Sequence, residues 1–243
     1  PSAKFTDATE AVGATVQGVS RRGKYLLVEL RGPDPVDRQL VVHLGMTGKL
    51  AVAPTASLEA SPHLRAVWHL GDGRSLTFVD VRRFGRIAVV PAGDHTGLPT
   101  LSQLGPEPWD PSFTGPSLRA FVNQRRRSVK TLLLSQRPVA GVGNIYADEA
   151  LWLAEVHPCA RRLTVAQADR LVAAVQSVLA AGVAHGGTTL RDYRDATGSI
   201  GGHQLHLRCY GRSGQPCERC GTSLRRIVVD ARSTTYCPTC QRR

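Results

Sequence analysis

The sequence predicts an α+β multidomain protein with an N-terminal antiparallel β-sandwich or barrel, a helical middle region and a C-terminal hairpin that binds a metal ion. Three observations predict this order. Short apolar runs fill the region up to about residue 90, helical periodicity follows a Pro- and Gly-rich segment at 91–116, and two Cys-x-x-Cys pairs stand near the C-terminus. We expect domains at 1–108, 109–205 and 206–243.

The N-terminal region contains candidate strands, each rich in Val, Leu and Ile and bounded by turn residues. They cover residues 25–30, 39–44, 65–70, 75–79 and 86–90. Asp72 and Gly73 favour a tight hairpin turn between the third and the fourth. Strands of this length and spacing are typical of an antiparallel sandwich or barrel.

The middle region has the period of helices. Apolar residues recur at helical spacing within 117–135, and the opposite, solvated face is expected to carry four cations: Arg125, Arg126, Arg127 and Lys130. Asn144 is a candidate N-cap for a helix over 145–156. Thr164 and Gln167 form a capping-box pattern that opens a helix running to about residue 184.

The composition indicates an acidic partner. Lys and Arg number 31 against 19 Asp and Glu, so the formal charge is +12 at pH 7. Hydrophobic residues make up 42% of the chain, which excludes a disordered protein. No apolar run approaches the ~18 residues of a membrane span, and the N-terminus shows no secretory signal. We therefore expect a cytoplasmic, monomeric protein without a membrane partner.

Four cysteines have the spacing of a metal site. Cys217 and Cys220 form one pair, and Cys237 and Cys240 form a second after sixteen intervening residues. Four thiolates on two such knuckles complete the tetrahedral shell of one structural Zn²⁺ and leave no position for water. Two disulfides or redox pairs are the alternative, which a reduced compartment disfavours.

The residues between the two cysteine pairs predict a hairpin. Residues 225–230 and 234–236 are β-like, and the turn between them would present Arg232 at its tip. Cys159 and Cys209 fall outside the metal spacing, so we expect ordinary buried or half-buried thiols there.

A glycine-rich turn precedes the second helix of the middle region. Gly141 and Gly143 allow close approach of another molecule, and the first amides of the helix, with Asn144 beside them, can hold a phosphate. The pattern is also that of a simple turn, and the upstream Arg run is also that of a solvated helix face. The net charge favours nucleic acid as the partner.

Polar residues stand in apolar surroundings within the β region. They are Lys24 in RRGKYLL, His43 in VVHLGM and Arg82 in DVRRFG, with Met46 and Phe84 nearby. Such residues often belong to a core or a sheet edge. The alternative is an apolar wedge and an arginine that enter a duplex and fill the gap left by an extruded base.

These motifs, taken together, resemble a known family. The order and spacing of RRGKYLL, HLGMTG, DVRRFG, LGPEP, GVGNIYADE, GGTTLRDY, YGRSGQPCERCG and ARSTTYCPTC resemble those of the formamidopyrimidine-DNA glycosylases, from about Val16 to the C-terminus. The resemblance implies a β-sandwich, a helix-two-turn-helix domain and a zinc finger, with DNA between the lobes. It also implies excision of oxidised purines, such as 8-oxoguanine and formamidopyrimidines, and β,δ-elimination at the abasic site.

The resemblance assigns residues by position. Lys24 matches a lysine that contacts phosphate and assists elimination, and Arg232 matches the arginine of the δ-elimination step. Met46, Arg82 and Phe84 match the residues that fill the void, with Arg82 facing the orphaned cytosine. The full set of implied DNA contacts is His43, Met46, His63, Arg82, Phe84, Arg126, Lys130, Asn144 and Arg232.

The resemblance further implies that the loop at 195–206 covers the damaged base, while Tyr146 and Glu149 have supporting roles. The chain departs from the family at its start. Family members begin Pro-Glu-Leu-Pro-Glu, and their proline amine attacks C1′ of the sugar. This chain begins Pro1-Ser2-Ala3-Lys4, about thirty residues closer to Lys24. We assign neither Pro1 as nucleophile nor Glu10 as acid, and we expect no excision of an intact base and weak nicking of abasic sites.

Two other functions stay open from the sequence. A non-catalytic protein that binds damaged or abasic DNA would need the same DNA contacts without the nucleophile. An RNA-binding or ribosome-associated zinc protein would explain the charge and the cysteines, but not Met46, Arg82 and Phe84.

Overall fold

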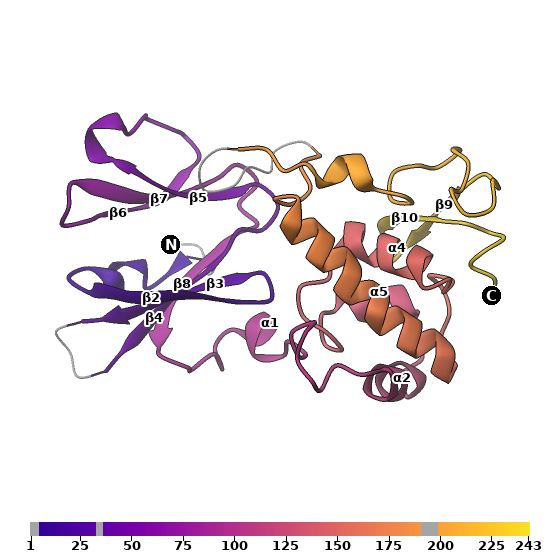
Figure 1. The fold of residues 1–243 in the computed structure, drawn as a ribbon. Coiled ribbons are helices and arrows are strands. Elements are labelled where there is room, and N and C mark those ends of the chain that lie inside the picture. The colour runs from indigo at the N-terminus through magenta and orange to yellow at the C-terminus, as the bar shows by residue number, and fades with distance from the viewer. Residues whose placement is uncertain (1–4, 33–35, 191–198) are drawn as a thin grey trace. The chain divides into compact units, whose positions relative to one another are not determined.

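The computed structural model describes residues 5–32, 36–190 and 199–243, and its contacts divide the chain into two compact units (Figure 1). The first unit comprises Pro1–Ser102 with Thr188–Gly201, and the second comprises Gln103–Gly187 with Gly202–Arg243. The first main boundary lies inside the expected boundary segment 91–116. The helical and finger segments, which the sequence predicts as two domains, share the second unit.

The first unit contains two β-sheets. The larger has the strand order β1-β8-β4-β3-β2, and the smaller has the order β5-β7-β6. All neighbours are antiparallel except β1, which pairs with β8 in parallel. The bounds are β1 (Phe5–Thr6), β2 (Thr15–Arg22), β3 (Tyr25–Arg31), β4 (Arg38–His43), β5 (Gly48–Pro54), β6 (Leu64–His69), β7 (Arg74–Asp80) and β8 (Arg86–Pro91).

The two sheets form a sandwich, as Figure 1 shows in the left half of the view. Val28, Val42 and Ile87 from the large sheet are buried together with Phe78 from the small one. Their inward positions recur with the period of two that strands impose. This packing confirms the predicted sandwich. The predicted hairpin turn at Asp72–Gly73 is also present, because the Leu70 amide donates to the Arg74 carbonyl and closes the β6–β7 connection.

Three strands were not predicted from the sequence: β1, β2 and β5. Strand β2 is an edge strand with mostly exposed residues and a register shift between Val16 and Gly18, so it lacks the apolar alternation that identifies a half-buried strand. Strand β5 has no fully buried residue. The periodicity of the sequence therefore found the central strands and the edge strand β6, and missed the other three edge strands.

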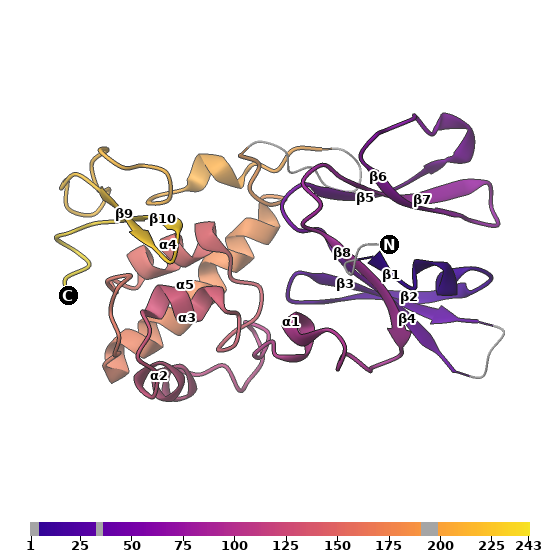
Figure 2. The same ribbon diagram turned by 180° about the vertical axis from the view of Figure 1, so that it is seen from behind.

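The second unit is built on four helices around a shared core (Figures 1 and 2). They are α2 (Gly115–Asn123), α3 (Val129–Leu134), α4 (Asn144–Leu153) and α5 (Val165–Ala184). Leu118, Leu133, Leu151 and Leu171 from the four helices are buried in one cluster. The first unit ends with the short helix α1 (Pro99–Ser102), and short 3₁₀ turns lie at Ala8–Ala11, Thr55–Ser57 and His203–His206.

Two local predictions about this unit are wrong. Lys130 is fully buried rather than on a solvated face, because the finger hairpin covers that side of α3. Gly143, not Asn144, is the N-cap of α4, and Asn144 is already the first helical residue. Arg125, Arg126 and Arg127 are exposed, as expected, but they lie in the connection between α2 and α3.

The C-terminal hairpin consists of β9 (Arg225–Val229) and β10 (Arg232–Tyr236). Asp230 and Ala231 form its turn with φ values of 46° and 58°. Two successive positive φ values are those of the tight turn that matches strand twist. Arg232 is therefore the first residue of β10, next to the tip, where it pairs with Val229.

The capping box of α5 is present as predicted. The Thr164 hydroxyl accepts a hydrogen bond from the Gln167 amide, and the Gln167 side chain accepts one from the Thr164 amide. Thr164→Ala should destabilise the protein by about 1 kcal/mol, because it leaves a helix-terminal amide without its partner. We expect the melting temperature to fall by about 2–4 °C in a thermal denaturation experiment. Thr164→Ser keeps the hydroxyl and serves as the control; an equal loss in both variants would contradict the role of the cap.

Candidate nucleic-acid interface and metal centre

The four predicted cysteines converge in the second unit. The sulfurs of Cys217, Cys220, Cys237 and Cys240 all lie within 4.8 Å of one another. A Zn–S bond of about 2.3 Å places the sulfurs of a tetrahedron about 3.8 Å apart. The Cys220 and Cys237 sulfurs are 3.5 Å apart, so the arrangement fits one Zn²⁺ with four thiolate ligands. This confirms the predicted structural zinc site.

The cysteine cluster packs on helix α4. The Trp152 indole N–H donates to the Cys217 sulfur over 3.4 Å, and the Arg219 guanidinium lies over the Trp152 ring at 4.5 Å. Cys209 is buried in the same apolar cluster, where burial raises the pKa of its thiol. Cys159 is half-buried. Both are thiols outside the metal site, as predicted.

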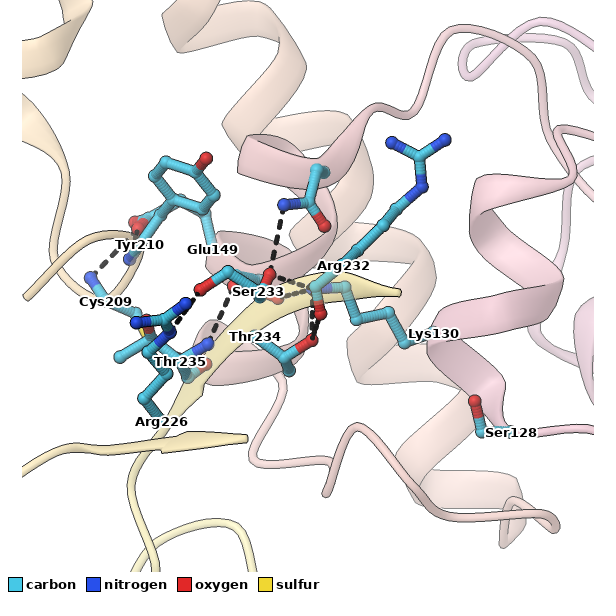
Figure 3. Close-up of polar contacts among 12 residues, drawn as sticks. Ser128, Lys130, Glu149, Cys209, Tyr210, Arg226, Arg232, Ser233, Thr234 and Thr235 are labelled. Atoms are coloured by element: carbon cyan, nitrogen blue, oxygen red, sulfur yellow. Dashed lines mark hydrogen bonds and ion pairs between the residues drawn. The ribbon is translucent and has the colours of Figure 1, made fainter. Parts of the chain in front are cut away.

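A buried ion pair joins the finger hairpin to two helices (Figure 3). The Lys130 ammonium of α3 lies 2.5 Å from the Asp148 carboxylate of α4, and both side chains are at most 1% exposed. Lys130 also donates to the Thr234 hydroxyl and to the Ser233 carbonyl of β10, while Asp148 accepts the Thr235 amide at 2.9 Å. The pair thus determines where β10 lies.

Burial opposes the charges of this pair. It lowers the pKa of Lys130 and raises the pKa of Asp148 to about 6, while each partner favours the charged form of the other. A buried charge that loses its partner is costly. Protein groups take all the space around the Lys130 ammonium, so this geometry does not support the predicted contact between Lys130 and DNA and we do not propose it.

Glu149 holds a second connection to the finger. Its carboxylate accepts the backbone amides of Arg208, Cys209 and Tyr210 at 2.7–3.0 Å. This confirms the supporting role expected for Glu149. Of these two adjacent acidic residues of α4, Asp148 therefore binds strand β10 and Glu149 binds the segment 208–210.

Asn144 and Arg232 are the first residues of α4 and β10, which are in contact. The Asn144 side-chain amide donates to the Ser233 carbonyl at 3.0 Å, which fixes the start of α4 against the hairpin. Arg232 is exposed, and in Figure 3 its guanidinium extends away from the hairpin, outside the drawn contacts. The first amides of α4 and this guanidinium together provide donors for a phosphate.

The first unit brings together three predicted residues of the β region. The Arg82 guanidinium lies 3.5 Å from the Met46 sulfur and 4.8 Å from the centre of the Phe84 ring. Met46 is 64% exposed and Phe84 is 49% exposed, so neither belongs to the core. An exposed apolar pair around an arginine is what insertion into a base stack requires.

The fully buried Asp80 fixes the two loops that carry these side chains. Its carboxylate accepts the Thr47 hydroxyl at 2.5 Å and the Gly85 amide at 2.7 Å. The Thr47 hydroxyl in turn accepts the Arg82 amide at 3.0 Å. A Cβ on Gly45 would lie 2.6 Å from the Phe84 carbonyl carbon, so the loops approach as closely as glycine allows.

A pocket of about 320 Å³ opens beside Met46. Lys24, in the β2–β3 turn, and His43, at the end of β4, are among its lining residues. Burial and then the nearby charges of Lys24 and Arg86 lower the pKa of His43. Its Nδ1 accepts the Gly45 amide at 3.1 Å, so in the neutral ring the proton is on Nε2, which can donate to a ligand.

Other predicted residues lie near this site or outside the described part. His63 is half-buried beside the same loops, since its carbonyl accepts the Asp80 amide. Pro1–Lys4 and residues 191–198 lie outside the described residues, so the first four residues and part of the expected loop at 195–206 have no structural account. The sequence reasoning gave no role to Thr47, Asp80 and Asp148, although they lie within the motifs HLGMTG, DVRRFG and GVGNIYADE, and that position was the signal that could have found them.

Comparison with known proteins decides the family. Models of the formamidopyrimidine-DNA glycosylase N-terminal domain, its H2TH domain and the zinc finger found in FPG and IleRS match residues 2–87, 104–194 and 214–243. The chain belongs to the formamidopyrimidine-DNA glycosylase family. The predicted family, fold class and class of enzyme are thereby confirmed.

Individual members of the family cover nearly the whole chain. The formamidopyrimidine-DNA glycosylase of Deinococcus radiodurans is 45% identical over 98% of this chain and 86% of its own length. The crystal structure of MutM (FPG) from Thermus thermophilus is 45% identical, with a TM-score of 0.88 over 98% of this chain and 87% of that one. Lactococcus lactis Fpg in complex with abasic-site DNA is 35% identical, with a TM-score of 0.84 over 95% and 83%.

Zinc binding should be required for the finger hairpin to fold. We expect one Zn²⁺ per chain, and Cys237→Ser should lower both the zinc content and the melting temperature, since metal binding at such sites is coupled to folding. Metal analysis and thermal denaturation measure the two effects. Cys159→Ser, outside the cluster, should change neither; full zinc content in the Cys237 variant would contradict the ligand assignment.

The buried ion pair should show strong coupling. Lys130→Met or Asp148→Asn alone should cost about 3–5 kcal/mol, because each leaves a buried group without its partner. The double variant should lose clearly less than the sum of the two single losses. Denaturant unfolding of the four proteins provides this cycle, and strictly additive losses would show that the two side chains do not stabilise each other.

Proposed function

We propose that this chain has the function of a base-excision-repair glycosylase and AP lyase for oxidised purines such as 8-oxoguanine and formamidopyrimidines, and that its described residues supply DNA recognition and the β,δ-elimination that nicks the abasic site, but not the nucleophile of base excision. The observation that carries the proposal is the juxtaposition of Met46, Arg82 and Phe84 beside the pocket of Lys24 and His43. We further propose that it works as a cytoplasmic monomer.

The wedge has a direct role in this proposal. When a damaged base leaves the stack, Met46 and Phe84 can occupy the apolar gap, and the Arg82 guanidinium can donate to the base that lost its partner. Asp80 and Thr47 hold the two loops in place before DNA binds, which lowers the cost of ordering them on binding.

The pocket beside the wedge has the donors that a DNA backbone needs. Lys24 supplies a positive charge, and neutral His43 supplies an Nε2 proton that can point at a phosphate oxygen. In elimination, Lys24 can stabilise the phosphate as it leaves the sugar. His63, near the same loops, is proposed as a further phosphate contact.

The helical and finger unit would bind the backbone at a second place. The first amides of α4, the Asn144 side chain and the exposed Arg232 guanidinium are proposed to contact phosphate there. Arg232 is also proposed to assist the δ-elimination step. Lys130 and Asp148 act indirectly, because they position β10 and thereby Arg232.

Base excision further needs an amine with a free electron pair to attack C1′. We assign no nucleophile among the described residues. Glu10 is not proposed as an acid, because its carboxylate is ion-paired with Arg38. Nicking of a preformed abasic site is less demanding, since its aldehyde reacts with any amine placed close to it.

Binding and nicking of abasic DNA test the proposed function. We expect the 243-residue chain to bind a duplex with a tetrahydrofuran abasic analogue at least about tenfold more tightly than an undamaged duplex. Lys24→Ala should slow the nicking of a natural abasic site. Fluorescence anisotropy and gel assays measure both. Equal affinity for the two duplexes would overturn the proposal.

Arg82 should determine the choice of the base opposite the lesion. Arg82→Ala should lower the preference among the four opposing bases by about 1–3 kcal/mol, because a paired hydrogen-bonding contact to a base is lost. Arg74→Ala is the matched control, since it removes the same charge from another exposed position of the same unit, at the start of β7. A uniform loss of affinity in the Arg82 variant, whatever the opposing base, would reject this role.

A further inference from the structure

A recess of about 460 Å³ in the second unit collects arginines from three separate segments. Arg126 and Arg127 come from the connection between α2 and α3, Arg161 follows α4, and Arg243 is at the end of the chain. Val228, Val229 and Asp230 of the hairpin line another part of it. None of these arginines has a part in the metal site or the wedge.

Protein side chains balance the charge of this recess only in part. Among its lining residues Asp230 is the sole carboxylate side chain, against four guanidinium groups. Within the described residues, none of the four arginines has an ion-pair partner. Other arginines of the same unit do, since Arg212 pairs with Glu218 and Arg219 with Glu155. Like charges gathered around one concave surface favour a bound anion.

The chemistry of the recess favours a phosphate. A guanidinium group offers a planar set of N–H donors that matches two phosphate oxygens at once. The hydroxyls of Ser128 and Thr131 add neutral oxygens to the same lining. Since several guanidinium groups line the recess, they can contact different oxygens of one tetrahedral anion.

The position of the recess favours a phosphate of DNA. Val229, which lines it, pairs directly with Arg232 across the hairpin, and only the turn at Asp230–Ala231 separates them in sequence. Each strand of a duplex carries a phosphate about every 3.4 Å along the axis. A strand that contacts Arg232 therefore has further phosphates within the width of the hairpin.

We propose that Arg127, Arg161 and Arg243 join Arg126, which the family resemblance already implies as a DNA contact, in a second backbone site that binds a phosphodiester of duplex DNA beyond the contacts of Asn144 and Arg232. This inference rests on the proposed function, because it takes duplex DNA as the ligand. The site adds affinity without reading the base sequence.

The chain offers a matched pair of double variants for the test. Arg161→Ala with Arg243→Ala removes two charges from the recess, and Arg162→Ala with Arg242→Ala removes two charges from the neighbouring positions, which do not line it. The two double variants therefore have the same net charge as each other. Zinc content and melting temperature, compared with the unchanged chain, show that each variant is folded.

The readout is the salt dependence of binding to a duplex of about 30 base pairs with a central tetrahydrofuran site. Each phosphate contact contributes about 0.9 to the slope of log affinity against log salt. We expect the recess variant to lose about one such contact and the control variant to keep the slope of the unchanged chain. Equal slopes in all three proteins, or equal losses in both variants, would overturn the proposal. If the unchanged chain does not bind this duplex, the proposed function itself fails.

Calorimetric titration with sodium pyrophosphate distinguishes DNA from a free phosphate compound as the ligand. Weak pyrophosphate binding that disappears in the recess variant, together with the change in slope, supports a phosphate site used by DNA. Pyrophosphate binding that disappears while the DNA slopes stay equal would overturn the assignment to DNA and assign the recess to a small phosphate ligand.

Discussion

Helix α3, helix α4 and the finger hairpin are joined through the buried contact between Lys130 and Asp148. The two side chains hold three consecutive residues of β10, and this strand begins with Arg232. Burial makes both charges costly unless they stay paired, so the contact tolerates few alternative arrangements. The zinc cluster fixes the other end of the same hairpin through Cys237. The position of Arg232 therefore depends on a metal site and a buried ion pair.

In the first unit, too, a buried acidic side chain positions exposed side chains that are proposed to contact DNA. Asp80, buried between two loops, accepts hydrogen bonds from Thr47 and Gly85 and thereby places Met46, Arg82 and Phe84 side by side. Exposed apolar side chains lower solubility and gain nothing in the free protein. A rigid support for them is consistent with a wedge that must enter DNA without first being ordered.

The positively charged side chains fall into two groups, one buried and one exposed. Lys130 neutralises Asp148 in the interior, whereas Arg82, Arg126, Arg161 and Arg232 stay exposed. The net charge of +12 alone indicates an acidic partner but does not say which cations face it. Exposure and the lack of an acidic partner distinguish a cation that can bind phosphate from one that holds the fold, and Lys130 shows that a motif match cannot make this distinction.

The sequence by itself determined the sandwich strands of the core, the capping box at Thr164, the zinc ligands and the family. These depend on local patterns, such as the period of two in a buried strand or the spacing of Cys217 and Cys220, which are readable along the chain. Only the tertiary structure decided the burial of Lys130, the cap of α4 and the roles of Asp80 and Asp148. Each depends on contacts between residues distant in sequence, as with Lys130 and Thr234. One sequence taken alone holds no record of which distant residues meet.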